Sequence, residues 1–280
     1  MLLTNKQTNQ FAIFYLLCFF INGIWFWYNN LLLSSIDPIY FINKLDFTCN
    51  ILMLSNVQHY LINEHWLCMS FDLLYYLLPA LLVIFYIKKV RGKNIVAYVT
   101  CVFTIIYSLC FSSFTYISME GYIGWILFPL IFSAVTLSGF YYYMYAVRII
   151  FILIFVSAAI FKIKSGAVFN VDQMGGILLT QHNNYLVSNP NNWFSKFIYY
   201  LVQHKAIAQS LFLLGTIAEL SFLLGLFNAR FDRLLIIIFC IFLVFDYILM
   251  QINYFTWMVF MGCFYFSSYN LEKKSSIKSI

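Results

Sequence analysis

The chain has 280 residues, of which 63% are hydrophobic and only 9% charged. Soluble domains carry about 25% charged residues, so a water-soluble core could not bury this much apolar surface. The formal net charge of +6 comes from lysines and arginines that gather at the ends of apolar segments, which indicates membrane topology and argues against a nucleic-acid-binding surface.

Apolar segments follow one another along the whole chain. A helix needs about 20 residues to cross the roughly 30 Å hydrocarbon layer of a membrane. Eight segments come close to this length, at 11–33, 69–87, 95–117, 122–140, 145–163, 206–227, 234–250 and 254–269. The first could instead be a signal peptide, but only Lys6 precedes it and no small-residue cleavage site follows it, so we expect a retained helix. The sequence thus predicts an all-α integral membrane protein with about eight transmembrane helices in one bundle.

Lysine and arginine positions predict the orientation, because cytoplasmic loops hold the excess of positive charge. With both termini cytoplasmic, the inner set is Lys6, Lys88, Lys89, Arg91, Lys93, Arg148, Arg230, Arg233, Lys273, Lys274 and Lys278, and the outer set is Lys44, Lys162, Lys164, Lys196 and Lys205. The histidines and most acidic residues, Asp72 among them, then fall on the outer side. We expect residues 1–280 to form a single polytopic domain without a soluble domain.

Two outer segments are longer than simple connectors. Ser34–Cys68 is amphipathic, so we expect it to lie in the membrane interface or to re-enter the bundle. Cys49 and Cys68 within it either pair or stay free. Lys164–Lys205 carries glycines and asparagines between regularly spaced apolar residues, which predicts a short helix that caps the bundle from outside.

Three ionisable residues interrupt or end apolar segments: Lys162, Glu219 and Asp246. A charge at membrane depth costs at least a few kcal/mol, so such side chains face a bundle interior or a wet cavity and are candidate functional residues. Lys162 closes the fifth segment. It is either an interfacial lysine with its ammonium in water or an amine that burial keeps neutral, which makes it a base.

The two carboxyl groups also leave alternatives open. Glu219 is either neutral and hydrogen-bonded between helices or functional, with Thr216 and Gly215 on its helical face to offer a hydroxyl and room for water. Asp246 is either an interfacial residue satisfied by Gln251 and Asn253 or lines the same outward cavity as Lys162.

No motif predicts a metal or nucleotide site. His59, Glu64 and His65 share the first outer segment, but their spacing matches no closed metal motif. The chain has no Walker loop, no nucleophile elbow and no dinucleotide-binding fingerprint.

The order of features over residues 150–269 follows a family pattern. In that pattern a helix end with small residues leads into a lysine, a glycine-containing outer segment follows, and then comes a helix with a carboxylate in mid-span. After an arginine-bearing turn the pattern has an aromatic–histidine pair, where this chain has Phe245-Asp246. These features read Ala158-Ala159-Ile160-Phe161-Lys162-Ile163, Gly175-Gly176, Glu219-Leu220, Arg230 and Arg233, Phe245-Asp246, Asn253, Phe255, Met258 and Phe260. This order resembles the membrane part of vitamin K-dependent gamma-carboxylase and its bacterial relatives, the horizontally transferred transmembrane (HTTM) proteins.

The resemblance implies that Lys162 is the base that deprotonates reduced vitamin K at the outer face. Glu219 and Asp246 would tune the pKa of Lys162 or contact the substrate. Two features differ from the carboxylase: Asp246 replaces the family's histidine, and the soluble region that binds the protein substrate is absent. Both differences argue against glutamate carboxylation itself. Bacterial relatives that mature exported peptides, as in the sporulation-delaying protein family, match this chain length better.

Three functions are consistent with these observations. The first is modification or maturation of an exported peptide or a membrane-borne substrate, with a reduced quinone as cofactor only if the chemistry is carboxylase-like. The second is a non-catalytic membrane partner in peptide export or immunity. The third is a small proton-coupled transporter with Glu219 as a relay, although no repeat or pair of broken helices supports it. The expected location is the bacterial cytoplasmic membrane, with the lipid bilayer as a partner.

Overall fold

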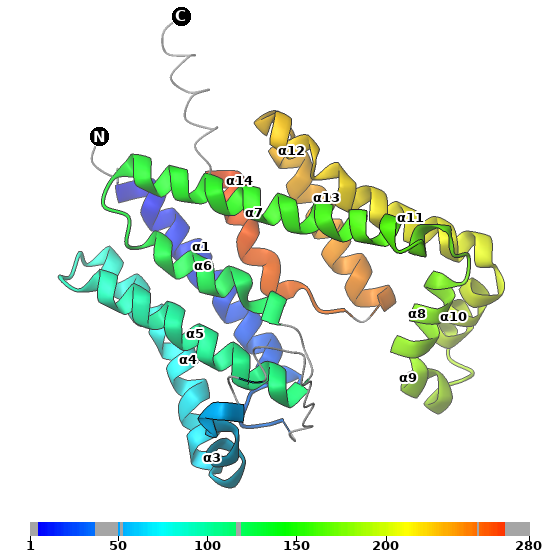
Figure 1. Ribbon diagram of the computed structural model, residues 1–280, viewed down its shortest axis with the longest axis horizontal. Helices are drawn as coiled ribbons and strands as arrows, with labels where there is room; N and C mark the ends of the chain where they lie inside the picture. The colour runs from blue at the N-terminus through cyan, green and yellow to red at the C-terminus, as the bar shows by residue number, and fades with distance from the viewer. Residues whose placement is uncertain (1–4, 37–49, 51–52, 116–118, 251, 267–280) are drawn as a thin grey trace, which may run out of the picture. The chain divides into compact units, whose positions relative to one another are not determined.

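A computed structural model describes residues 5–36, 50, 53–115, 119–250 and 252–266 (Figure 1). Within these ranges the chain is helical and contains no strand. Two compact units divide it: unit 1 comprises Met1–Met144 and Phe255–Ser268, and unit 2 comprises Tyr145–Tyr254 and Tyr269–Ile280. The boundary falls inside the long helix α7 (Leu137–Lys164).

The helices of unit 1 enclose an aromatic core. They are α1 (Asn5–Tyr28), α3 (Val57–Asn63), α4 (His65–Ile87), α5 (Lys93–Thr115), η1 (Met119–Tyr122), α6 (Ile123–Ile131), η5 (Phe255–Phe260) and α14 (Met261–Phe266). On α1, Phe11, Tyr15 and Phe19 are almost completely buried at helical spacing. Phe11 packs against Phe128 of α6 and Phe266 of α14. Both pairs bring elements that are distant in the sequence onto α1.

Unit 2 pairs long helices with a group of short ones. It holds the rest of α7, η2 (Ala167–Phe169), α8 (Gln173–Gln181), α9 (Asn183–Ser188), α10 (Trp193–Gln203), α11 (Lys205–Ser221), α12 (Leu224–Phe227), η3 (Ala229–Phe231), α13 (Asp232–Phe245) and the π-helical turn η4 (Asp246–Met250). Phe151 and Phe155 of α7 pack edge-on against Phe239 of α13. Phe222, just after α11, joins the same cluster.

The short helices α8, α9 and α10 form what we call the cap. Their apolar side chains pack on α11 and η4 in one cluster of Met174, Leu178, Leu186, Ile198, Leu201, Ala208, Phe212 and Leu249. The α8 helix packs on α10 at Gly175, where a Cβ would lie in ordinary contact with Val202, 3.9 Å from its Cα. A helix was predicted in this segment, and the described chain has three.

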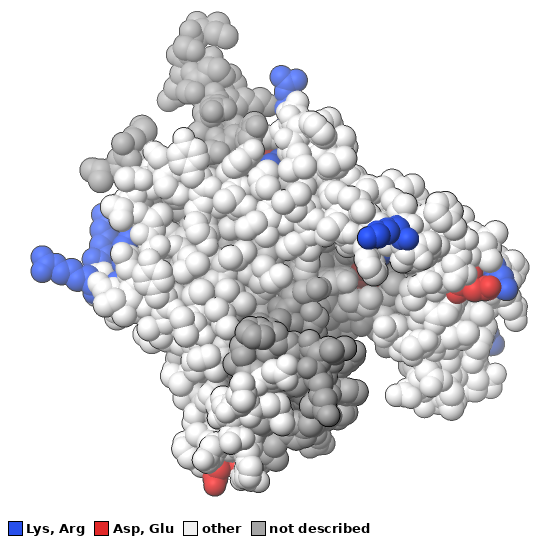
Figure 2. Space-filling model, viewed as in Figure 1, with Lys and Arg blue, Asp and Glu red and all other residues white. Residues whose placement is uncertain are grey.

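Within the described residues, six helices are long and apolar enough to cross a membrane: Gln7–Tyr28, His65–Ile87, Lys93–Ser112, Leu137–Lys164, Lys205–Phe227 and Ala229–Met250. Their exposed side chains are mostly apolar, as with Leu214 and Ile217, which are about three-fifths exposed on α11. Most of the face shown in Figure 2 likewise carries neither acidic nor basic side chains. These features are those of a multi-pass membrane protein.

The predicted spans 122–140 and 145–163 have different boundaries in the structure. The segment α6 ends at Ile131, and α7 then runs without a break from Leu137 to Lys164. Pro129 lacks an amide donor, and the three amides that follow α6, of Phe132, Ser133 and Ala134, bond to carbonyls three residues back, which closes the helix. The Thr136 hydroxyl accepts from the amide of Gly139 at 3.1 Å and so caps the start of α7.

The predicted span 254–269 is shorter within the described residues. Phe255–Phe260 is a 3-10 helix and Met261–Phe266 an α-helix, with six residues each. Together they reach about 20 Å at 1.5 to 2.0 Å per residue, less than the hydrocarbon thickness. Eight full spans are therefore not confirmed, and residues 267–269 of this prediction lie outside the described chain.

The predicted segment Ser34–Cys68 is only partly described. The helix α4 begins at His65, so the last residues of the predicted outer segment belong to a long helix. The Cys68 thiol is buried and donates to the carbonyl of Leu61 at 3.1 Å. Cys49, its predicted alternative partner, lies outside the described residues.

Candidate functional site

Lys162 and Glu219 form an ion pair in unit 2. Lys162 lies in the last turn of α7, which ends where Gly166 adopts a left-handed conformation with φ of 78°. Its Nζ donates to Oε1 of Glu219 on α11 at 2.7 Å. The Lys162 side chain is 30% exposed, whereas that of Glu219 is 6% exposed. The carboxylate is therefore enclosed, and the amine remains partly accessible.

Asp246 belongs to the same cluster. Its side chain is buried, at 6% exposure, and it interacts electrostatically with both Lys162 and Glu219. Asp246 begins the π-helical turn η4, which follows directly on α13. Such widened turns are rare and occur frequently at functional sites, because the extra residue per turn redirects side chains. The three residues singled out from the sequence thus converge in unit 2.

Phe212 completes the surroundings of the amine. Its ring centroid lies 5.5 Å from Nζ of Lys162, within the range of a cation–π contact. Phe212 precedes Glu219 by two helical turns on α11 and is also part of the cluster beneath the cap. Phe212 was not among the residues predicted from the sequence, although its spacing from Glu219 places both on one helical face.

Of the two features expected to serve Glu219 on its own helix, the Thr216 hydroxyl does not bind the carboxylate. The Thr216 hydroxyl donates to the carbonyl of Phe212 at 3.0 Å, as helical threonines often do, and not to the carboxylate. A Cβ at Gly215 would meet no atom within 4 Å, so there is room at that position. The second carboxylate oxygen of Glu219, Oε2, is buried and receives no hydrogen bond from the described residues.

This arrangement suits proton transfer. One ammonium lies among two carboxylates, so the cluster has more acceptors than charged donors. Enclosure disfavours the charged carboxylate of Glu219, and the hydrogen bond from the partly exposed Lys162 ammonium offsets this cost. The 2.7 Å hydrogen bond between Nζ of Lys162 and Oε1 of Glu219 joins an amine directly to a carboxylate. The free Oε2 is an acceptor for a hydroxyl or amide of a substrate.

Two of the three residues weighed as metal ligands, His59 and Glu64, have other partners. The Nδ1 of His59 lies 2.6 Å from Nδ2 of Asn63, and Glu64 accepts from the Trp66 indole at 2.8 Å. His65 opens α4. Among the residues that the structure describes, no group of three or more His, Cys, Asp or Glu side chains is placed to hold a metal ion.

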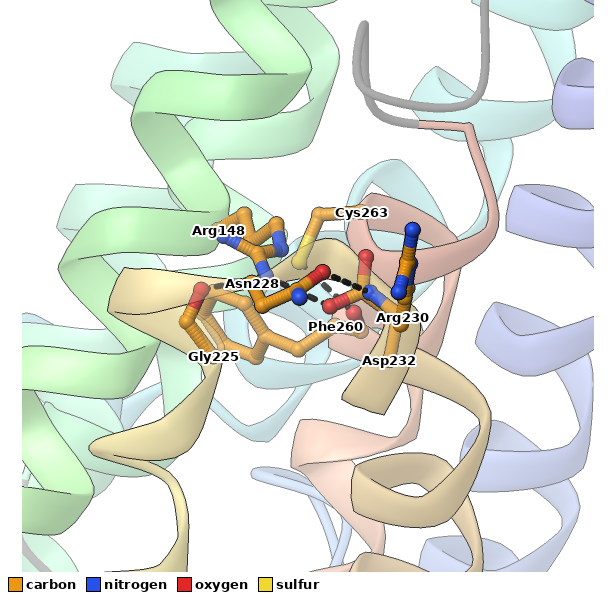
Figure 3. A network of polar contacts seen from close by, with 7 residues as sticks. All are labelled: Arg148, Gly225, Asn228, Arg230, Asp232, Phe260 and Cys263. Atoms are coloured by element: carbon orange, nitrogen blue, oxygen red, sulfur yellow. Dashed lines mark hydrogen bonds and ion pairs between the residues drawn. The ribbon is translucent and has the colours of Figure 1, made fainter. Parts of the chain in front are cut away.

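A second buried ion pair in unit 2 was missed by the sequence analysis (Figure 3). Arg148 was counted in the predicted inner set, and in the structure it lies within α7 and is fully buried. Its Nη2 donates to Oδ1 of Asp232 at 2.5 Å and to the carbonyl of Gly225 at 2.7 Å. A side chain at Gly225 would collide with Ile152 and Leu235. The signal in the sequence was a single arginine in an otherwise apolar segment.

Asp72 is the corresponding buried carboxylate of unit 1. It was predicted to lie on the outer side of the membrane, and in the structure it is enclosed on α4 at 6% exposure. It accepts from the amides of Leu33 and Ser34 at 3.1 and 2.9 Å, and from the Tyr107 hydroxyl at 2.6 Å. With three donors already bound, Asp72 ties the end of the α1 segment to α4 and α5 and is structural.

Comparisons with protein-family models, with curated proteins and with solved structures found no match for this chain. The family resemblance stated above is therefore untested, and the cluster is interpreted from its own geometry.

Proposed function

We propose that this chain is a multi-pass membrane protein that modifies or matures an exported peptide or a membrane-borne substrate, with Lys162 as the base. The observation that carries the proposal is the 2.7 Å contact between Lys162 and Glu219, with the buried Asp246 near enough to be influenced by the charges of both. These residues lie far apart in the sequence and are costly at membrane depth. Their convergence favours a functional role over independent interfacial anchors.

In the proposed mechanism, the proton of Lys162 passes to Oε1 of Glu219 along their hydrogen bond. The neutral amine then accepts a proton from the substrate, and the partly exposed position of Lys162 gives the substrate access. Asp246 stabilises the ammonium that results. Oε2 of Glu219 accepts a hydrogen bond from a substrate hydroxyl or amide and orients it.

The resemblance to the carboxylase family supports this proposal at the level of chemistry. We propose the same outward-facing orientation, with the termini in the cytoplasm of a bacterial cell. A reduced quinone has hydroxyl groups that fit the acceptor Oε2 of Glu219, and it would supply reducing electrons when bound. Asp246 stands at the family's histidine position, so modifications other than glutamate carboxylation fit better.

A matched set of lysine substitutions tests the proposal. Lys162→Arg keeps the positive charge beside Glu219 but cannot become a neutral base, and Lys162→Ala removes both. We expect both variants to abolish the mature exported product, as measured by mass spectrometry of secreted peptides at equal membrane abundance. Lys164→Ala, two residues away and exposed, serves as the control and should leave the product unchanged.

An unchanged peptide profile in Lys162→Arg would refute Lys162 as the base.

The second candidate function, proton relay, is favoured by the buried carboxylates of Glu219 and Asp246 beside a single amine. It predicts that Glu219→Gln abolishes proton flux into proteoliposomes, while no peptide or lipid product changes in mass.

A further inference from the structure

His182 connects the cap to the turn that carries Asp246. It lies between α8 and α9 and is only 1% exposed. Its Nε2 lies 2.7 Å from the carbonyl oxygen of Leu249, in η4. Since a carbonyl oxygen only accepts, Nε2 carries the proton and donates. The ring also packs edge-on against Phe194 of α10, with centroids 5.1 Å apart.

The acceptor of this bond belongs to a turn that needs support from outside. Leu249 lies three residues after Asp246, in the same π-helical turn. Carbonyl oxygens in the last turn of a helix receive no hydrogen bond from an amide of the same helix. A side chain, water or ligand must therefore donate to them. A π-helical turn is also less stable than an α-helical one. The histidine supplies a fixed donor at the end of η4.

We propose that His182 is a positioning residue for Asp246. By holding the carbonyl of Leu249, it keeps η4 in its widened form and keeps the Asp246 carboxylate beside Lys162 and Glu219. The proposal deepens the proposed function, on which it rests, by adding a residue from the cap to the control of the amine. In the alternative role, His182 would only fasten the cap, as Leu186 does through apolar packing.

The reactivity of Lys162 distinguishes these roles. In purified full-length protein, acylation of Lys162 by an amine-reactive ester is measured by peptide mass spectrometry and divided by that of Lys205. Lys205 is an internal reference, because its side chain is 59% exposed and pairs with Asp172 at the surface. Only the neutral amine reacts, so withdrawal of a nearby carboxylate raises the ratio.

Two substitutions of His182 distinguish its hydrogen-bond donor from the packing of its ring. His182→Phe keeps an aromatic ring against Phe194 but has no donor, and His182→Gln keeps an amide donor at about the reach of Nε2. We expect His182→Phe to raise the Lys162 to Lys205 ratio about three- to tenfold, as for loss of one nearby charge. His182→Gln should restore the wild-type ratio. His182→Asn, too short to reach Leu249, replaces His182→Phe if the latter does not fold.

A double-mutant cycle with Asp246→Asn tests whether His182 affects Lys162 through Asp246. Asp246→Asn alone should raise the ratio as His182→Phe does, and the two together should raise it no further. The control Leu186→Ala loosens the cap without removing the donor and should leave the ratio unchanged. An unaltered ratio in His182→Phe, an equal rise in Leu186→Ala, or full additivity with Asp246→Asn would each overturn the proposal. The acylation ratio is measured without any peptide product. Failure of this proposal can therefore be distinguished from failure of the proposed function, which the secreted-peptide assay tests.

Discussion

At the scale of single residues, the two ion pairs of unit 2 differ in how far their side chains are buried. Lys162 is 30% exposed beside Glu219, whereas Arg148 is completely enclosed beside Asp232. An enclosed pair contributes little net stability, because desolvation offsets the attraction between its charges, but removal of one partner leaves the other charge uncompensated. We therefore assign Arg148 and Asp232 to the architecture of unit 2, whereas the accessible Lys162 is the residue that we propose for its chemistry.

This assignment predicts the effect of Arg148→Met. The substitution leaves the Asp232 carboxylate and the Gly225 carbonyl without their donor, and we expect it to lower the free energy of unfolding by about 3–5 kcal/mol. The double variant Arg148→Met/Asp232→Leu replaces the pair by apolar side chains and should recover most of that loss. Unfolding in detergent, followed by circular dichroism, measures both. Equal destabilisation of the single and the double variant would contradict the assignment.

At the scale of secondary-structure elements, the boundary between α6 and α7 illustrates what hydropathy alone misses. The predicted spans 122–140 and 145–163 followed the apolar content, which continues across residues 132–136. The chain instead breaks after Pro129 and starts a new helix at Thr136, because a missing amide donor ends one helix and a hydroxyl cap begins the next. Capping signals therefore decide this boundary more strongly than hydropathy.

The cap of α7 gives an element-scale prediction. Thr136→Ala removes the acceptor for the Gly139 amide and should destabilise the first turn of α7 by about 1 kcal/mol. Thr136→Ser retains the hydroxyl and should behave like the wild type. Hydrogen exchange at the amides of residues 137–140, measured by mass spectrometry, reports the difference. Equal exchange in the alanine and serine variants would show that the hydroxyl does not cap the helix.

At the scale of the whole molecule, the distribution of positive charge predicts how the chain crosses the membrane. The turn between α4 and α5 holds Lys88, Lys89 and Arg91, which is the excess typical of a cytoplasmic loop. The 23 residues of α4 span about 35 Å, enough to cross the hydrocarbon layer. The segment before α4 should accordingly lie on the outer side.

Cysteine accessibility tests this orientation at the two ends of α4. Single cysteines at Asn63 and Arg91, both exposed positions, are introduced into a background without the native cysteines. We expect a membrane-impermeant thiol reagent to label Asn63→Cys in intact cells and Arg91→Cys only after the membrane is opened. The reverse pattern would invert the proposed topology, and labelling of both in intact cells would exclude α4 as a membrane-spanning helix.

The sequence by itself determined the membrane class and the helical content, because apolar content is a property of each segment regardless of what it packs against. For the same reason it singled out Lys162, Glu219 and Asp246, since the cost of a charge at membrane depth is local to the residue that carries it. It also predicted a helix between Lys164 and Lys205 from the spacing of apolar residues, although not the three helices of the cap.

Only the tertiary structure decided which charges meet. Lys162 and Glu219 are 57 positions apart, and their contact depends on the packing of α7 against α11, which hydropathy does not encode. The same holds for Arg148 with Asp232 and for His182 with Leu249, whose partners lie on other helices. Desolvation acts on each residue alone and can be read from one sequence. Hydrogen bonds and ion pairs join two residues, and their geometry exists only once the helices have packed.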